Sequence, residues 1–158
     1  MSRFTPCLGF DTQAKEAAEF YVSVFKNSKL KQVTYYGEHG PMPKGTVLTA
    51  SFEIDGQEFL ALNGGPYFKF TEGVSLIVNC NSQAEIDEYW AKLTADGGQE
   101  VQCGWLKDKY GLSWQVIPKA LMRYLTDPDR AKADRVMQAM LKMKKIDVAA
   151  LDRAAAAS

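Results

Sequence analysis

The sequence is poor in the residues that build most metal sites and disulfide frameworks. His39 is the single histidine, and Cys7, Cys80 and Cys103 are three cysteines without CxxC spacing. An odd number of cysteines that follow no signal-like N-terminus disfavours a disulfide framework. We therefore expect three reduced thiols in a cytoplasmic protein.

Net charge and long apolar runs are also missing. The 19 Lys and Arg residues balance the 19 Asp and Glu residues, so no overall field recruits nucleic acid or an anionic membrane. The longest apolar runs, such as residues 74–78, are far shorter than the roughly 20 residues of a membrane-spanning helix. The sequence predicts neither a nucleic acid nor a membrane partner. Its 158 residues suit one compact domain, which is the default, or two small half-domains that share a core.

The first part of the chain predicts a strand, a helix and three further strands. The expected strands span residues 3–10, 29–36, 46–54 and 57–63. Asp11 or Thr12 is a suitable N-cap for the helix between the first two strands. Apolar side chains recur in it at helical spacing, at Ala17, Tyr21, Val24 and Phe25. The Asp55-Gly56 pair between the last two strands is a strong hairpin signal.

The same order of elements begins again at residue 74. Strands are expected at residues 74–80, 100–105 and 112–117. Ser82 and Glu85 have the spacing of a capping box that opens a helix, and Gly97-Gly98 ends it. The repeated order of elements, more than the few matching residues, indicates a duplication.

Helical patterns replace the strand pattern near the C-terminus. Helices are expected at residues 120–124 and 129–145, with Asp147 as the cap of a last short helix, and residues 154–158 are expected to fray. An apolar stripe follows the second helix at Val136, Met137, Met140 and Leu141. That stripe is suited either to covering the domain's own sheet or to contacting a second subunit.

These patterns predict an α+β fold in which two βαβββ modules form a curved mixed sheet, followed by C-terminal helices. The expected domain spans residues 1–123, with module one at 1–63 and module two at 74–118. Residues 124–158 are expected to form a helical extension.

One face of each predicted sheet has a mixed composition. Side chains at alternate positions of a strand lie on opposite faces of the sheet. One of the two sets is uniformly apolar, and we expect helices to cover it. The other set carries Thr5, Cys7, Gly9, Glu58, Leu60 and Leu62 in module one, and Ser75, Ile77, Asn79, Ser113, Gln115 and Ile117 in module two. A curved sheet with a mixed face is suited to holding a small molecule.

Several stretches resemble a known family. They are TPCLGFD at residues 5–11, EFY at 19–21, FLALNGGP at 59–66 and YGLSWQVIP at 110–118. Together they resemble the PhnB-like branch of the vicinal-oxygen-chelate (glyoxalase/bleomycin-resistance/dioxygenase) superfamily, whose members are often labelled 3-demethylubiquinone methyltransferase domains. The resemblance covers residues 4–123 and implies a glyoxalase-like fold and a homodimer.

The chain departs from the family at the positions that bind metal. Metal-using members of the superfamily place His or Glu at positions that correspond here to Thr5, Leu60, Ser75 and Gln115. None of these residues is an imidazole or a carboxylate, so we expect no metal ion. No strand is followed by GxGxxG or a related Gly-rich turn, so we expect no nucleotide-like cofactor and do not adopt the methyltransferase label.

Three functions remain open from the sequence. The first is a small-molecule-binding protein or metal-independent enzyme, with a cleft formed by Thr5, Cys7, Glu58, Leu60, Ser75, Trp105, Ser113 and Gln115. In that cleft Trp105, which precedes a turn, would close over the ligand as a flat wall, and Glu58 would supply any general base. The second is a divalent-metal enzyme of the lyase, isomerase or dioxygenase type that uses His39 and Glu58. The third is a dimeric interaction module with a vestigial cleft. The catalytic residues and the substrate stay unknown.

Overall fold

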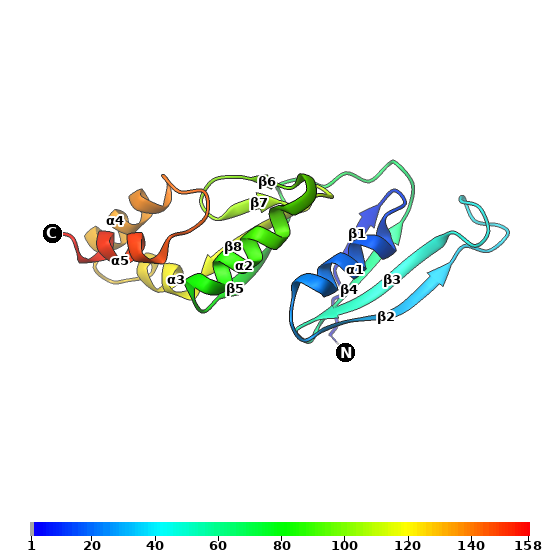
Figure 1. The fold of residues 1–158 in the computed structure, drawn as a ribbon, viewed down its shortest axis with the longest axis horizontal. Helices are drawn as coiled ribbons and strands as arrows, with labels where there is room; N and C mark the ends of the chain where they lie inside the picture. Colours follow the sequence, from blue (N-terminus) through cyan, green and yellow to red (C-terminus); the bar gives the residue numbers. More distant parts are fainter. Residues whose placement is uncertain (1) are drawn as a thin grey trace. The chain divides into compact units, whose positions relative to one another are not determined.

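The computed structural model describes residues 2–158, and the chain divides into two compact units, Met1–Phe70 and Thr71–Ser158. Each unit contains a four-stranded mixed sheet, with strand order β1-β4-β3-β2 in the first and β5-β8-β7-β6 in the second. In each sheet the first neighbouring pair, β1 with β4 and β5 with β8, is parallel, and the remaining pairs are antiparallel. The two βαβββ modules of the predicted α+β fold are therefore confirmed (Figure 1).

Unit one follows the predicted order of elements. Its elements are β1 (Cys7–Phe10), α1 (Ala14–Val24), β2 (Ser28–Tyr35), β3 (Val47–Ile54) and β4 (Gln57–Asn63). The first strand was expected from residue 3 but begins at Cys7, because Pro6 has no N–H with which to continue the ladder. The Asp55-Gly56 hairpin is confirmed, with φ of 48° and 85° at its two residues.

The start of α1 differs from the sequence expectation. Gln13 occupies the N-cap, and neither Asp11 nor Thr12 caps the helix. Instead, the first helical N–H, on Ala14, donates to the side-chain oxygen of Asn63 at 2.9 Å. The amide of Asn63 also donates to the carbonyl of Val47, at 3.1 Å. A residue of β4 thus satisfies the helix end that a local cap would otherwise satisfy.

Aromatic side chains form the core between α1 and the first sheet. Tyr21 of α1 stacks on Phe52 of β3 with ring centroids 6.0 Å apart, and Phe52 stacks on Phe59 of β4 at 5.3 Å. All three side chains are buried. Helix α1 lies along this face of the sheet (Figure 1). Since side chains alternate along a strand, the mixed set of residues lies on the opposite face.

Unit two repeats the module and adds three helices. Its elements are β5 (Ser75–Cys80), α2 (Gln83–Thr94), a 3₁₀ turn (Ala95–Gly97), β6 (Gln99–Glu100), β7 (Trp105–Lys107), β8 (Ser113–Pro118), α3 (Lys119–Leu125), α4 (Arg130–Met140) and α5 (Val148–Ala156). The predicted cap of α2 is confirmed, since the Ser82 hydroxyl accepts a hydrogen bond from the N–H of Glu85 at 3.2 Å. Asp147 caps α5 as expected, accepting from Ala150.

The strand expected at residues 100–105 is wrong. It is divided by a turn in which Cys103 and Gly104 both have positive φ, 60° and 84°. A strand cannot continue through two left-handed residues, so β6 ends at Glu100 and β7 begins at Trp105. Trp105 is therefore the first residue of β7 and follows a turn. The sequence had predicted that it stands before a turn and outside a strand.

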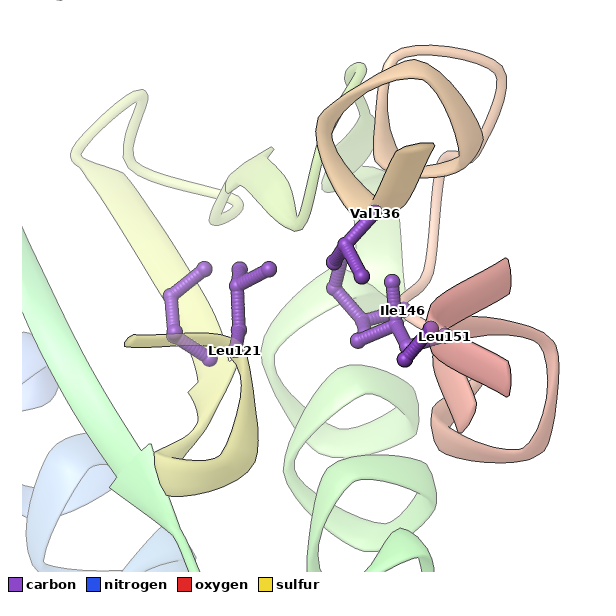
Figure 2. Packing of buried hydrophobic residues seen from close by; sticks show 6 residues of the cluster. Leu121, Val136, Ile146 and Leu151 are labelled. Carbon is purple, nitrogen blue, oxygen red and sulfur yellow. The ribbon is translucent and has the colours of Figure 1, made fainter. Parts of the chain in front are cut away.

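The three C-terminal helices have a shared apolar core with the end of β8. Figure 2 shows the side chains of Val136, Ile146 and Leu151 gathered between α4 and α5, with Leu121 contributed by α3. Val136, Ile146 and Leu151 are fully buried. The stripe of α4 thus packs mainly on α3 and α5 within unit two, with Ile117 at the end of β8 as the sheet's contribution. Contact with a second subunit stays a prediction.

Two details of the C-terminal helices correct the sequence expectation. α4 ends at Met140 and not at residue 145, and Leu141 is 58% exposed instead of belonging to the buried stripe. Residues 154–156 are helical and do not fray, because the Arg135 guanidinium donates to the carbonyls of Ala154 and Ala155 at 3.0 Å each. Among residues 2–158, none of the helices is long and apolar enough to cross a bilayer.

Candidate ligand-binding site

The exposed face of the second sheet carries a rank of three side chains from three neighbouring strands. Trp105 of β7 is opposite Gln115 of β8, and Gln115 is opposite Ile77 of β5. Side chains at paired positions project from the same face of a sheet. Ile77 is 56% exposed, although it is a large apolar residue in the middle of a strand. This rank therefore presents a flat aromatic, an amide and an aliphatic side chain side by side.

A second polar rank adjoins the first. Ser75 and Ser113 are paired in register, and the Gln115 amide donates to the Ser75 hydroxyl at 3.0 Å. That bond fixes the side chain of Gln115 against the sheet. The Ser113 hydroxyl is buried and has no hydrogen-bond partner among the described residues. The sequence-predicted residues Ser75, Trp105, Ser113 and Gln115 are thus neighbours in unit two.

A hollow of about 430 Å³ lies over the first rank. The sheet and the turn before β7 supply Ile77, Asn79, Cys103, Trp105, Gln115 and Ile117. Helices α3 and α4 supply Leu121, Met122, Leu125 and Met140. Small-molecule sites in proteins typically have volumes of about 300–1,000 Å³, so this hollow has the size of a binding pocket.

The lining of this pocket is neutral. Its polar groups are the amides of Asn79 and Gln115 and the thiol of Cys103, and the remaining lining residues are apolar or aromatic. A few polar groups in an apolar pocket orient a ligand, while the apolar walls supply most of the binding free energy. The pocket is therefore suited to an uncharged organic molecule.

The sequence-predicted residues of unit one form a different kind of surface. Cys7 and Leu60 are paired in register, and Glu58 lies two residues along the same face of β4. Thr5 precedes β1 and is exposed. A Cβ on Gly9 would lie 2.7 Å from the ring of Phe68, so the segment after β4 packs onto this face. Within unit one, therefore, an aromatic ring of the chain itself covers part of the mixed face.

Glu58 is a poor general base in this setting. Its carboxylate pairs with the ammonium of Lys31. The hydrogen bond and the charge of Lys31 hold the pKa of Glu58 below its ordinary value, and the same pair raises the pKa of Lys31. A carboxylate with a lowered pKa has less tendency to accept a proton at neutral pH.

Cys7 and Cys80 have little nucleophilic character because the pKa of each thiol is raised. Burial and the nearby charge of Glu85 raise the pKa of Cys80 to about 12, and desolvation also raises the pKa of Cys7. The thiolate is the reactive form, and a raised pKa makes it scarce. These two cysteines are therefore not suited to nucleophilic catalysis.

The residues at the family's metal positions do not fit a divalent ion. They offer two hydroxyls, an aliphatic side chain and an amide, at Thr5, Ser75, Leu60 and Gln115. A stable site needs several carboxylates, imidazoles or thiolates. Within residues 2–158, no group of three or more His, Cys, Asp and Glu side chains is placed to share a metal ion. His39 is exposed, and its neighbour Glu38 pairs with Lys44 at 3.1 Å.

Sequence reasoning missed half of the pocket. The sequence predicts Trp105 and Gln115 as ligand-binding but gives no indication of Cys103 or of the four helical residues. Leu121 and Leu125 are four residues apart in α3, a spacing that places them on one helix face. That spacing was a usable signal, but it could not indicate that the helix folds back over the exposed side of its own sheet.

Comparison with known proteins agrees with this architecture. The family model described as 3-demethylubiquinone-9 3-methyltransferase matches residues 2–117. The structure of a PhnB protein from Bacillus cereus, provisionally described as a 3-demethylubiquinone-9 3-methyltransferase, is 36% identical with a TM-score of 0.67. The match covers 74% of this chain and 99% of that one. None of the curated proteins compared with the chain matches it.

More distant structures share the fold alone. A glyoxalase/bleomycin resistance protein from Albidiferax ferrireducens is 13% identical with a TM-score of 0.51, covering 75% of this chain and 99% of its own. The fosfomycin resistance protein FosX from Mesorhizobium loti is 11% identical with a TM-score of 0.53. The match covers 80% of this chain and 100% of that one. The family match over residues 2–117 and the 36% identity to the Bacillus protein carry the assignment. The chain belongs to the 3-demethylubiquinone-9 3-methyltransferase family of PhnB-like proteins and has the fold of the glyoxalase-like superfamily.

Proposed function

We propose that this protein binds a small organic molecule in the pocket on the exposed face of the second sheet, and that it does so without a resident metal ion. The observation that carries the proposal is the hollow of about 430 Å³ over Trp105, Gln115 and Ile77. An exposed aliphatic residue and an anchored amide in one concavity are what a ligand site needs. The donor set at the family's metal positions supports the metal-independent part.

The activities in the names of related proteins do not transfer to this chain. Methyl transfer requires a bound methyl donor. Gly64-Gly65 follows β4, but the next element is a strand, so this turn is not the strand–turn–helix unit that binds a nucleotide-like cofactor. The fosfomycin resistance protein shares only the fold at 11% identity, and one fold hosts many chemistries. We therefore propose binding and leave the reaction class open.

We also propose that the protein works as a cytoplasmic homodimer. Its three cysteines are free, which suits a reducing compartment, and the PhnB-like family implies pairing. Light scattering after size exclusion would give a mass near twice 17.6 kDa if the protein pairs. A mass near 17.6 kDa at every concentration would contradict the dimer.

The binding proposal is tested by thermal shift on protein purified without a metal-binding tag. A metabolite library is screened against wild type, Gln115→Ala and the control Gln138→Ala. Gln138 is an exposed glutamine of α4 whose amide donates to Asp134 on the same helix, outside the pocket. A ligand present at about 100 times its dissociation constant adds about 2.7 kcal/mol to the free energy of unfolding. We expect that stabilisation to fall in Gln115→Ala and to persist in Gln138→Ala.

Elemental analysis of the same preparation tests the metal-independent part. A stoichiometric divalent metal, with ligand stabilisation that disappears on chelation, would overturn it and favour the metal-enzyme alternative. If no compound stabilises the wild type, the interaction module with a vestigial cleft becomes the better reading. Equal losses in Gln115→Ala and Gln138→Ala would place the ligand elsewhere.

A further inference from the structure

The C-terminal helices lie outside the part of the chain that defines the family. The family match ends at residue 117, and α3 begins at Lys119. The Bacillus protein is matched over 99% of its own length but over only 74% of this chain. Residues 119–156 are therefore an addition to a module that the relative has complete.

This added segment is built into unit two. The N–H groups of Cys103 and Gly104 donate to the carbonyls of Met143 and Lys144, both at 2.8 Å. The side chain of Gln83 in α2 donates to the carbonyl of Ile146 at 3.0 Å and accepts from the N–H of Val148 at 2.8 Å. Backbone bonds of this kind hold the helices in one position, so the surfaces they present are preorganised.

The same helices form one side of the pocket. Leu121, Met122, Leu125 and Met140 supply the wall opposite the sheet. Leu121 is anchored in the shared core of the helices at 3% exposure, whereas its neighbour Met122 is 55% exposed. Methionine is flexible and polarisable, and it is used where a surface adapts to an apolar ligand. Met122 therefore presents a flexible, exposed side chain on the helix side of the pocket.

The chemistry of the combined lining limits the occupant. The sheet side offers one engaged amide, Gln115, and one amide, Asn79, for which no side-chain hydrogen bond exists among the described residues. The helix side offers only hydrocarbon and thioether. An ionised ligand would lose hydration in this pocket without gaining an opposite charge.

We propose that the segment beyond residue 117 gives this protein selectivity for a neutral, mainly apolar small molecule that carries one hydrogen-bonding group. The neutral pocket that α3 and α4 close over Ile77 and Gln115 carries this inference. It rests on the proposed binding function and adds the substrate class and the part of the chain that sets it. The apolar portion of the ligand packs against Met122 and Met140, and its polar group meets the amides on the sheet.

Two fluorescent probes with one skeleton test the ligand class. N-phenyl-1-naphthylamine is neutral, and 8-anilinonaphthalene-1-sulfonate is the same skeleton with an anionic group. Both become brighter in apolar surroundings, so the full-length protein can be titrated with each. We expect the neutral probe to bind about tenfold or more tightly than the sulfonate, because the pocket offers no compensating cation.

Three substitutions with matched exposure test the location. Ile77→Glu changes the sheet side, Met122→Glu changes the helix side, and Leu141→Glu is the control outside the pocket. The three native side chains are 56%, 55% and 58% exposed, so each variant should fold, as tryptophan emission will check. We expect the first two to weaken the neutral probe by about tenfold or more and Leu141→Glu by less than about twofold.

The outcomes separate the two proposals. Loss of binding in Ile77→Glu with unchanged binding in Met122→Glu would overturn the role of the helices and leave the proposed function standing. No binding of the neutral probe by wild type would overturn the selectivity, while the metabolite screen would still decide the proposed function. Equal affinity for the sulfonate would overturn the selectivity. A probe signal that falls as the protein associates into a dimer would show that a second copy occupies the pocket. That outcome would also overturn the proposed ligand selectivity.

Alkylation by N-ethylmaleimide gives an independent readout of position. Cys103 lines the pocket, whereas Cys7 is exposed in unit one and Cys80 is buried. Peptide mass spectrometry will follow each thiol with and without the neutral probe. We expect the probe to slow modification of Cys103 several-fold and to leave Cys7 unchanged, as binding excludes reagent. Unchanged modification of Cys103 at saturating probe would contradict the assignment.

Discussion

Leu151 tests whether the added helices share the folding unit of the second sheet. Its side chain is fully buried among Ile117, Leu121, Val136, Ile146 and Ala155. Replacing a buried leucine with alanine removes transfer free energy and leaves a cavity, and typically costs about 2–5 kcal/mol. We expect Leu151→Ala to lower the free energy of unfolding of unit two by about 3 kcal/mol.

Tryptophan fluorescence can measure this loss in unit two alone. The chain has three tryptophans, Trp90, Trp105 and Trp114, and all of them belong to unit two. A urea titration followed at the tryptophan emission therefore reports that unit while unit one stays silent. With an m-value near 1.5 kcal/mol/M, a loss of about 3 kcal/mol lowers the midpoint by about 2 M.

Leu141→Ala is the matched control for this experiment. Leu141 is also a leucine of the added segment but is 58% exposed, and an exposed substitution changes stability by less than about 0.5 kcal/mol. If both variants shift the tryptophan midpoint equally, the helices are not part of the core of unit two. The preorganised pocket wall would then lose its structural basis.

Three further substitutions test individual contacts. Asp108 is buried and accepts from the Trp114 indole at 2.8 Å, so Asp108→Asn should lower the free energy of unfolding by about 1–3 kcal/mol in a urea titration followed at the tryptophan emission. The exposed control Asp96→Asn should change it little. Gly9→Ala should displace Phe68 and speed chymotryptic cleavage after it, whereas Gly37→Ala, with open space around its Cβ, should not. The pKa of Glu58 is lowered by Lys31, so the stability it contributes is present above the usual carboxyl pKa and is lost as the pH falls through the lowered value. Thermal unfolding by circular dichroism should find Glu58→Gln less stable than wild type at neutral pH and equal to it in strong acid; a constant difference would contradict the pairing.

The sequence was sufficient for those features that local rules determine. Period-two alternation placed Trp114 and Val116 on one face of β8, with Leu112 just before the strand, and all three are buried. The Asp55-Gly56 turn and the Ser82 cap depend on residues a few positions apart, which is why both were predictable. The cap of α1 was not, since Asn63, which supplies it, is 49 residues from Ala14.

The pocket was half predictable for the same reason. Strand parity identifies the side of a sheet that helices of the module leave uncovered, so it selected Gln115, with Trp105 as the wall beside it. Nothing local specifies where an added helix lies. The positions of Met122 and Met140 follow from tertiary bonds of the 143–148 segment to Gln83 and to the turn at Cys103 and Gly104.

Gly104 connects the added segment to the pocket. At φ of 84° it adopts a conformation that favours glycine, and a Cβ there would lie 2.9 Å from Ile117 and 3.0 Å from Ile146. Its N–H donates to Lys144 and its carbonyl accepts from Val116, both at 2.8 Å. One residue thus joins the start of β7, the end of β8 and the chain that leads to α5. Because the same turn sets Cys103 and Trp105 beside the pocket, a change in how the helices pack also changes the binding surface. Diversification of a shared fold through an added segment needs such a link, since helices that were only tethered could not hold a pocket wall in place.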